Sequence, residues 1–297
     1  MVMVPRTAAQ DPLAMAVSAY LAQAPNHRAH VTGNGPLDRQ VTFGAGRWFP
    51  WLLNGGRPHQ RGYCGPMPNP MAALATSLVA QLPRTAAGEC RIDRPLLRAM
   101  AVTAQRGTPN DLVRLWLATM MWGGGSSDGR RPWRTAQGLA YPQLVHVLAQ
   151  SATQVWGGTP GAAHGFAVPG SGESYFTKWL WASSLALAPG ATRPLILDYR
   201  VRVVWNLVHA AAPVPLRGTA GYLCYLQRTW TAGAAVARGN PHVDGEKLEW
   251  LMFDRGGRDH PPFGEPCFVH WLRQGGIAGQ GGGPGAGVGP RPMNPQG

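Results

Sequence analysis

The sequence predicts a mainly α-helical protein. Apolar residues recur at helical spacing through most of its 297 residues, and prolines and glycines separate one helical stretch from the next. The helical pattern is nearly continuous, without an interior linker, so residues 1–274 are expected to form one domain. Residues 275–297 are dominated by glycine and proline, which predicts a disordered tail.

The first third of the chain contains three predicted helices. They cover residues 11–22, 71–82 and 95–105, each between proline or glycine breaks. Residues 32–61 are rich in glycine and lack clear periodicity, yet they contain Trp48 and Trp51. We therefore expect an irregular segment that packs onto the body and includes one or two short strands.

A stronger helix is predicted from Asn110, because apolar residues share one face and Asn110 or Asp111 can cap it. It should end at Gly123. Residues 126–135 then combine small residues, three arginines and a tryptophan, which predicts a loop. This loop would either contact phosphates or serve as a solvated connection that Trp133 anchors. Another helix is predicted over residues 141–154.

The charge of the chain suggests its partner. Its 27 basic and 14 acidic residues give a formal charge of +13, which favours a polyanion such as nucleic acid. Biased codon usage would produce the same arginine-rich composition. The four cysteines lie far apart, so we expect no metal site. No long apolar run occurs, so we expect no membrane segment. We therefore expect a cytoplasmic protein.

Lys178 is one of only two lysines and lies among Phe176, Trp179 and Trp181. Burial beside these rings would lower the pKa of its amine, and the neutral amine is a nucleophile. The alternative is a surface lysine that extends its charge into water. The other lysine, Lys247, lies in a polar run and is expected to be an ordinary surface residue.

A tight turn precedes Lys178. The run Val168-Pro169-Gly170-Ser171-Gly172 leads into a helix predicted over residues 173–187. Such a turn presents N–H groups that favour a phosphate, although turns of this kind more often only connect helices. Twenty residues after Lys178, Asp198 follows an apolar run and is well placed as the N-cap of the next helix.

Residues 165–209 resemble the helix-hairpin-helix DNA glycosylases, particularly the bacterial 8-oxoguanine DNA glycosylase fold group. The resemblance implies a two-lobed helical fold around a cleft, with Lys178 and Asp198 as the catalytic pair. It also implies a hairpin that binds the DNA backbone, here through Gly170, Ser171, Gly172 and Ser174. The usual lysine of that superfamily falls on Ser174, and Lys178 lies one turn further, about 5 to 6 Å along the helix axis.

The implied activity is excision of a damaged or modified base that is flipped out of double-stranded DNA. The resemblance leaves open oxidised guanine, in repair, and hypermodified cytosine, in defence against phage. A Schiff base on Lys178 would permit strand cleavage as well. Arg130 and Arg131 would contact DNA, and Trp122 and Trp181 would line the base pocket. No cofactor is expected, and the protein would act as a nucleoid-associated monomer.

Two other functions remain open from the sequence. A helix-hairpin-helix protein that binds DNA without catalysis would use the same turn. An unrelated Schiff-base enzyme would use Lys178 on a small carbonyl substrate.

Overall fold

The computed structural model describes residues 11–33, 40–59, 62–124, 130–164, 168–254 and 264–276. These residues form fourteen helices and one two-stranded sheet, which confirms the mainly α-helical prediction. The chain after Gly276 lies outside the described residues, so the division into a domain of residues 1–274 and a tail of residues 275–297 stays a prediction.

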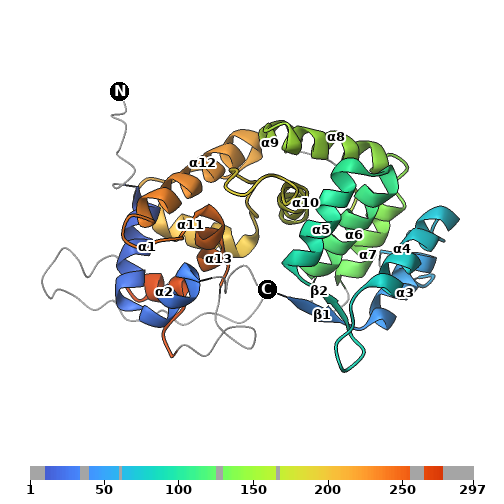
Figure 1. The fold of residues 1–297 in the computed structure, drawn as a ribbon, viewed down its shortest axis with the longest axis horizontal. Coiled ribbons are helices and arrows are strands. Elements are labelled where there is room, and N and C mark those ends of the chain that lie inside the picture. Colours follow the sequence, from blue (N-terminus) through green and yellow to red (C-terminus); the bar gives the residue numbers. More distant parts are fainter. Residues whose placement is uncertain are drawn as a thin grey trace, which may run out of the picture.

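The helices gather in two groups (Figure 1). The terminal group combines the first and last helices of the chain, namely α1 (Pro12–Gln23), α2 (Pro25–Thr32), α11 (Tyr199–Val208), α12 (Gly218–Val236), α13 (Gly245–Phe253) and α14 (Phe268–Arg273). The central group contains α3 (Ala45–Asn54), α4 (Asn69–Gln81), α5 (Arg94–Arg106), α6 (Pro109–Gly124), α7 (Arg130–Leu139), α8 (Leu144–Trp156) and α10 (Glu173–Ser184). The short α9 (Pro160–Ala163) contacts α8 and α12 and so joins the groups.

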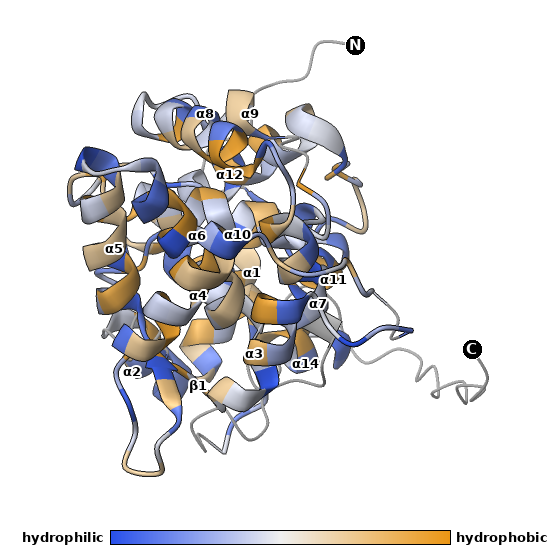
Figure 2. Cartoon of the chain, turned by 90° about the vertical axis from the view of Figure 1, so that its right-hand side faces the viewer, coloured by the Kyte–Doolittle hydropathy of each residue, from blue (hydrophilic) through white to orange (hydrophobic). Residues whose placement is uncertain are grey.

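Helix α6 is the centre of the central group and packs against α4, α5, α7, α8 and α10. The predicted face is buried at Leu112, Leu115, Trp116 and Met120, and residues on its other sides are buried too. Most other helices carry both hydrophobic and hydrophilic residues, as Figure 2 shows. A helix surrounded on all sides can therefore hold the outer, amphipathic helices in place.

The prediction of an irregular segment over residues 32–61 is wrong in part. The expected short strand is present as β1 (Val41–Phe43), which pairs antiparallel with β2 (Cys90–Ile92). Residues Ala45–Asn54 form α3, although Pro50 lies inside that helix. Gly55 ends it in the left-handed conformation with φ 64°. Trp48 and Trp51 are buried, as expected.

The loop predicted over residues 126–135 is wrong from Arg130 onward, because α7 begins there. Pro132 lies in the first turn, where a proline removes no helical hydrogen bond. Residues 125–129 lie outside the described part of the chain. The largest other differences from the predicted bounds are three residues: α8 begins late, at Leu144, and α10 ends early, at Ser184.

Candidate active site

The turn before α10 packs directly against α7. Gly170 has φ 78°, and a Cβ on it would lie 2.2 Å from the carbonyl oxygen of Arg134. A side chain at this position is therefore excluded both by the backbone conformation and by contact. Ser171 N–H donates to the Val168 carbonyl at 2.9 Å, which closes the turn. The two segments predicted to contact DNA thus lie side by side.

The arginines of α7 lie at the start of that helix. Arg130 and Arg131 occupy its first turn, and their side chains are outside what the structure describes. Arg134 is exposed, and its guanidinium lies 5.5 Å from the ring centre of Trp133. The backbone contact with Gly170 places this arginine next to the turn.

Lys178 is a buried residue of α10, with 8% of its surface exposed. Its Nζ donates to the Ser174 Oγ at 2.9 Å and lies 5.4 Å from the ring centre of Tyr175. The side-chain stem lies on Gly123 of α6, where an added Cβ would be 2.6 Å from the lysine Cδ. The absence of a side chain at Gly123 provides the space for the lysine.

This geometry relates Lys178 to the position at which the sequence resemblance places the catalytic lysine. Lys178 lies one turn after Ser174, the position that the resemblance implies for the lysine. Helical side chains point back toward the N-terminus, and the Lys178 amine accordingly reaches both the Ser174 hydroxyl and, at 3.4 Å, the Ser174 carbonyl. The length of the lysine side chain offsets the shift of about 5 Å along the axis.

Asp198 is the N-cap of α11, as the sequence predicts. Its Oδ1 accepts from the backbone N–H of Arg200 at 2.8 Å and of Val201 at 3.0 Å. The residue is 9% exposed. Since Oδ1 makes both capping bonds, the carboxylate has a second oxygen for other partners.

The segment that leads to Asp198 is extended, and its backbone groups are bound by side chains from neighbouring helices. Among the donors, Trp230 Nε1 binds the Arg193 carbonyl at 2.9 Å, Tyr222 Oη the Leu195 carbonyl at 2.9 Å, and Tyr225 Oη the Ile196 carbonyl at 3.1 Å. The Oε2 atom of the Glu249 carboxyl group accepts from Ile196 N–H at 3.0 Å. Buried backbone without regular structure needs such partners, which here fix its position.

Thr177 connects this segment to α10. Its hydroxyl oxygen accepts from Leu197 N–H at 3.1 Å and donates to the Glu173 carbonyl at 2.8 Å. The bonded residues immediately precede Lys178 and Asp198 in the chain. A direct hydrogen bond therefore joins the two segments just before the predicted catalytic residue of each.

The N-termini of α10 and α11 are also joined. Glu173, the first residue of α10, forms an ion pair with Arg202 of α11. His164 lies 3.6 Å from the other oxygen of Glu173, and burial lowers the pKa of this histidine. The start of α10, directly after the turn, is consequently held against α11, which Asp198 caps.

The two predicted pocket tryptophans stack on each other, with ring centres 4.8 Å apart. Trp181 is 2% exposed, and its Nε1 donates to Glu246 at 3.0 Å. The Arg94 guanidinium lies 4.9 Å from its ring centre. Trp181 has no free face for a base, so Trp122, which is half-buried and next to Gly123, is the stronger pocket candidate.

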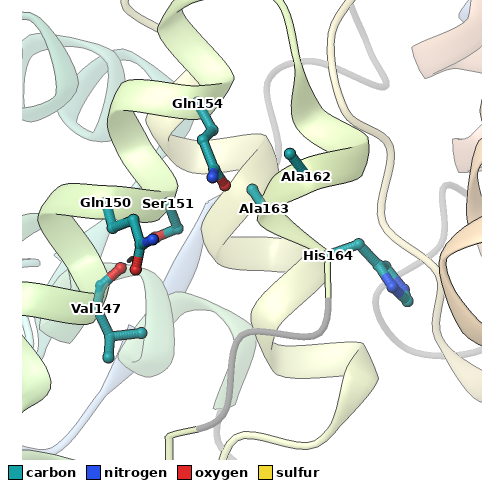
Figure 3. Close-up of a pocket in the computed structure, with 7 residues that line it drawn as sticks. All are labelled: Val147, Gln150, Ser151, Gln154, Ala162, Ala163 and His164. Carbon is teal, nitrogen blue, oxygen red and sulfur yellow. Dashed lines mark hydrogen bonds between the residues drawn. The ribbon is translucent and has the colours of Figure 1, made fainter.

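A cavity between α8 and α9 is distinct from this site. It is lined by Gln150 and Gln154 of α8 with Ala162 of α9, and Figure 3 shows the His164 side chain directed away from these glutamines. Trp179 faces that side, because its Nε1 donates to Ser151 of α8 at 2.8 Å. Lys178 instead contacts α6, so the cavity does not hold the amine.

The expectation for Lys247 is wrong. This lysine is 4% exposed, and its Nζ donates to the Thr32 carbonyl at 3.4 Å. Burial lowers the pKa of its amine. Its polar neighbours in sequence, Glu246 and Glu249, are buried as well, so local polarity did not indicate the surface here.

A family model described as "Putative 8-oxoguanine DNA glycosylase OGG-like protein" matches residues 35–253. The chain belongs to this family. The OGG-like match includes the turn, Lys178 and Asp198, and the family suggests a DNA glycosylase that acts on DNA. No curated protein and no solved structure matches the chain. None of the helices described here is long and apolar enough to cross a membrane.

Proposed function

We propose that this protein excises a damaged or modified base from double-stranded DNA, with Lys178 and Asp198 as the catalytic pair. The observation that carries the proposal is the 2.9 Å hydrogen bond from the Lys178 amine to the Ser174 hydroxyl. This bond supports the proposal, because it brings the amine back to Ser174, the position that the resemblance implies for the lysine, shortly after the turn at Gly170.

The DNA backbone would be held at the turn. The N–H groups around Gly170 and Gly172 open α10, and a helix N-terminus favours a phosphate through hydrogen bonds and the helix dipole. Arg134 lies against the same turn, with Arg130 and Arg131 one turn earlier on α7. Arginine binds phosphate oxygens in a bidentate manner. The net charge of +13 supports the same partner.

The reaction would start with a base flipped out of the stack, since the glycosidic bond is inaccessible within the duplex. The neutral amine of Lys178 attacks C1′, and the C1′–N bond breaks as the base leaves with the electron pair and takes up a proton. Asp198 stabilises the positive charge that develops on the sugar and accepts a proton from the new ammonium group. Opening of the C1′–O4′ bond then gives an imine that permits strand cleavage.

The test is borohydride trapping on duplexes that contain either 8-oxoguanine or glucosylated hydroxymethylcytosine. The wild-type protein should form a covalent adduct with one of them, and Lys178→Gln should abolish it. Asp198→Asn should slow base release by about 100-fold or more. The matched control is Lys247→Gln, because Lys247 is the second of only two lysines and should leave trapping intact.

Several outcomes would contradict this assignment. Base release that persists undiminished in both Lys178→Gln and Asp198→Asn would exclude the catalytic pair. Base release without trapping would indicate that water, and not Lys178, is the nucleophile, and that Asp198 acts as the general base. Tight DNA binding without release from any duplex, in a screen of oxidised and phage-modified bases, would favour a non-catalytic DNA-binding protein.

A further inference from the structure

Tyr199 is an aromatic residue left in solvent beside Asp198. Its side chain is 79% exposed, more than any other large apolar side chain among the described residues. Among the described residues, the Tyr199 side chain makes no hydrogen bond, ring contact or ion pair. The other exposed large apolar side chains range from 37% at Val102 and Leu207 to 58% at Met15.

The position of Tyr199 relates it to the candidate site. It is the first residue of α11, directly after the N-cap Asp198. Three residues later, Arg202 pairs with Glu173 at the start of α10, next to the DNA-binding turn. The ring is therefore exposed on the side where two helix N-termini meet. Both termini favour anions, so this side suits the DNA backbone.

The backbone at Tyr199 is held in place, while its side chain is exposed to solvent. The backbone that carries Tyr199 is held by the Asp198 cap and by the buried Val201. Arg200 covers the Phe253 ring, with its guanidinium 4.9 Å from the ring centre. Arg200 is thus engaged with a ring of the protein, whereas 79% of the Tyr199 surface is exposed.

We propose that Tyr199 stacks on a nucleobase of the bound DNA at the position of the excised base. This inference rests on the proposed function. Flipping a nucleotide removes a stacking partner from its neighbours and from the opposite base, and an aromatic ring replaces it without regard to sequence. The ligand is the flat face of a base, either in the target strand or opposite the excised position.

The test uses duplexes that carry a tetrahydrofuran abasic analogue and the matched intact duplex, so no knowledge of the excised base is needed. The wild-type protein should bind the abasic duplex about tenfold more tightly than the intact one. Tyr199→Ala should lose most of this preference, consistent with about five-fold to 100-fold for one stacked base. Tyr199→Phe should keep it. The control, Met15→Ala, removes another exposed apolar side chain and should behave as wild type.

Photocrosslinking identifies the base. Two duplexes carry 5-iodouracil, one beside the analogue in the target strand and the other opposite the analogue. Tyr199 should crosslink to one of these two positions, which identifies the base on which it stacks. Equal preference for the abasic duplex in wild type and Tyr199→Ala overturns the inference while leaving the proposed function in place. If the protein binds neither duplex, both fail. If the stacking effect is present but no modified base is released, Tyr199 stacks at a gap in the duplex, whereas the glycosylase function, and with it stacking at an excised base, fails.

Discussion

The Thr177 hydroxyl accepts a hydrogen bond from the Leu197 N–H at 3.1 Å, and each of these residues precedes a candidate catalytic residue. Both partners are fully buried. We expect Thr177→Val to leave the Leu197 N–H without an acceptor, which costs about 1 to 3 kcal/mol of stability. Base release should fall by about tenfold as Asp198 shifts.

Thr177→Ser keeps the hydroxyl and should restore most of the activity and the melting temperature. Thr103→Val is the control, since that hydroxyl binds only the Ala99 carbonyl on the exposed side of α5. An equal loss of activity in Thr103→Val would contradict the role of the Thr177 bond. The measurements are thermal melting and single-turnover base release.

Gly123→Ala should displace the lysine rather than unfold the protein. The new Cβ would lie 2.6 Å from Lys178 Cδ and 3.2 Å from its Cε, atoms that can move. Borohydride trapping should fall by at least about tenfold, while alanine adds helix propensity of about 1 kcal/mol. Gly46→Ala, where nothing lies within 4 Å, should melt higher without any change in trapping.

The reach of Lys178 predicts that the lysine can be moved back by one turn. A double variant, Ser174→Lys with Lys178→Ser, puts the lysine at the superfamily's usual position and leaves a hydroxyl on Gly123. We expect trapping within about tenfold of wild type, because lysine spans the rise of one turn. Complete loss, with an unchanged far-UV circular dichroism spectrum, would show that only the present lysine position reaches the sugar.

Gly170→Ala should impair DNA binding through the turn. Its φ of 78° and the 2.2 Å approach to the Arg134 carbonyl oxygen both oppose a side chain. The backbone conformation alone costs about 1 to 2 kcal/mol in a non-glycine residue. Gly158 has a similar φ of 76° with open space around it, so Gly158→Ala measures the cost of the backbone conformation without the steric contact. Only Gly170→Ala should weaken binding to an intact duplex, measured by fluorescence anisotropy.

Glu249 should make stability depend on pH. Burial raises the pKa of this carboxyl from 4.5 to about 8. The folded state therefore holds the proton more tightly than the unfolded state, and its contribution to stability is complete below pH 4.5 and is lost as the pH rises toward 8. Each pKa unit corresponds to about 1.4 kcal/mol.

Glu249→Gln keeps an acceptor for Ile196 N–H and removes the titration. The difference in unfolding free energy between this variant and wild type should increasingly favour the variant from pH 5 to 8 and then level off. Urea denaturation at several pH values measures it. A difference that does not change with pH would contradict the raised pKa.

Local chemistry made the helix starts around the candidate site predictable from the sequence. The Pro-Gly-x-Gly turn marks where the backbone can enter a new helix, and an aspartate after an apolar run is a favourable N-cap, so the starts of α10 and α11 agree with prediction. The helix α3 was missed because Pro50 and nearby glycines suppress the local signal, whereas burial of Trp48 and Trp51 overrides it.

The remaining contacts depend on residues distant in the chain. The fit of Lys178 onto Gly123 involves two helices 55 positions apart, and Glu249 binds the backbone of Ile196 across 53 positions. Lys247 is polar in a polar run, and only the packing of α13 shows that it is buried. No periodicity in one sequence encodes such pairings.

Glu246 of α13 contacts both groups of helices. Its buried carboxylate pairs with Arg94 of α5 and accepts a hydrogen bond from Trp181 Nε1 of α10 at 3.0 Å. It also lies 3.6 Å from Nη1 of Arg193, in the segment before α11. Separating the groups would break the buried ion pair with Arg94 and the hydrogen bond from Trp181, and would expose the apolar surface of the Trp181 ring. The two halves are thereby made interdependent in folding, so heat should melt the protein in a single cooperative transition instead of one lobe after the other.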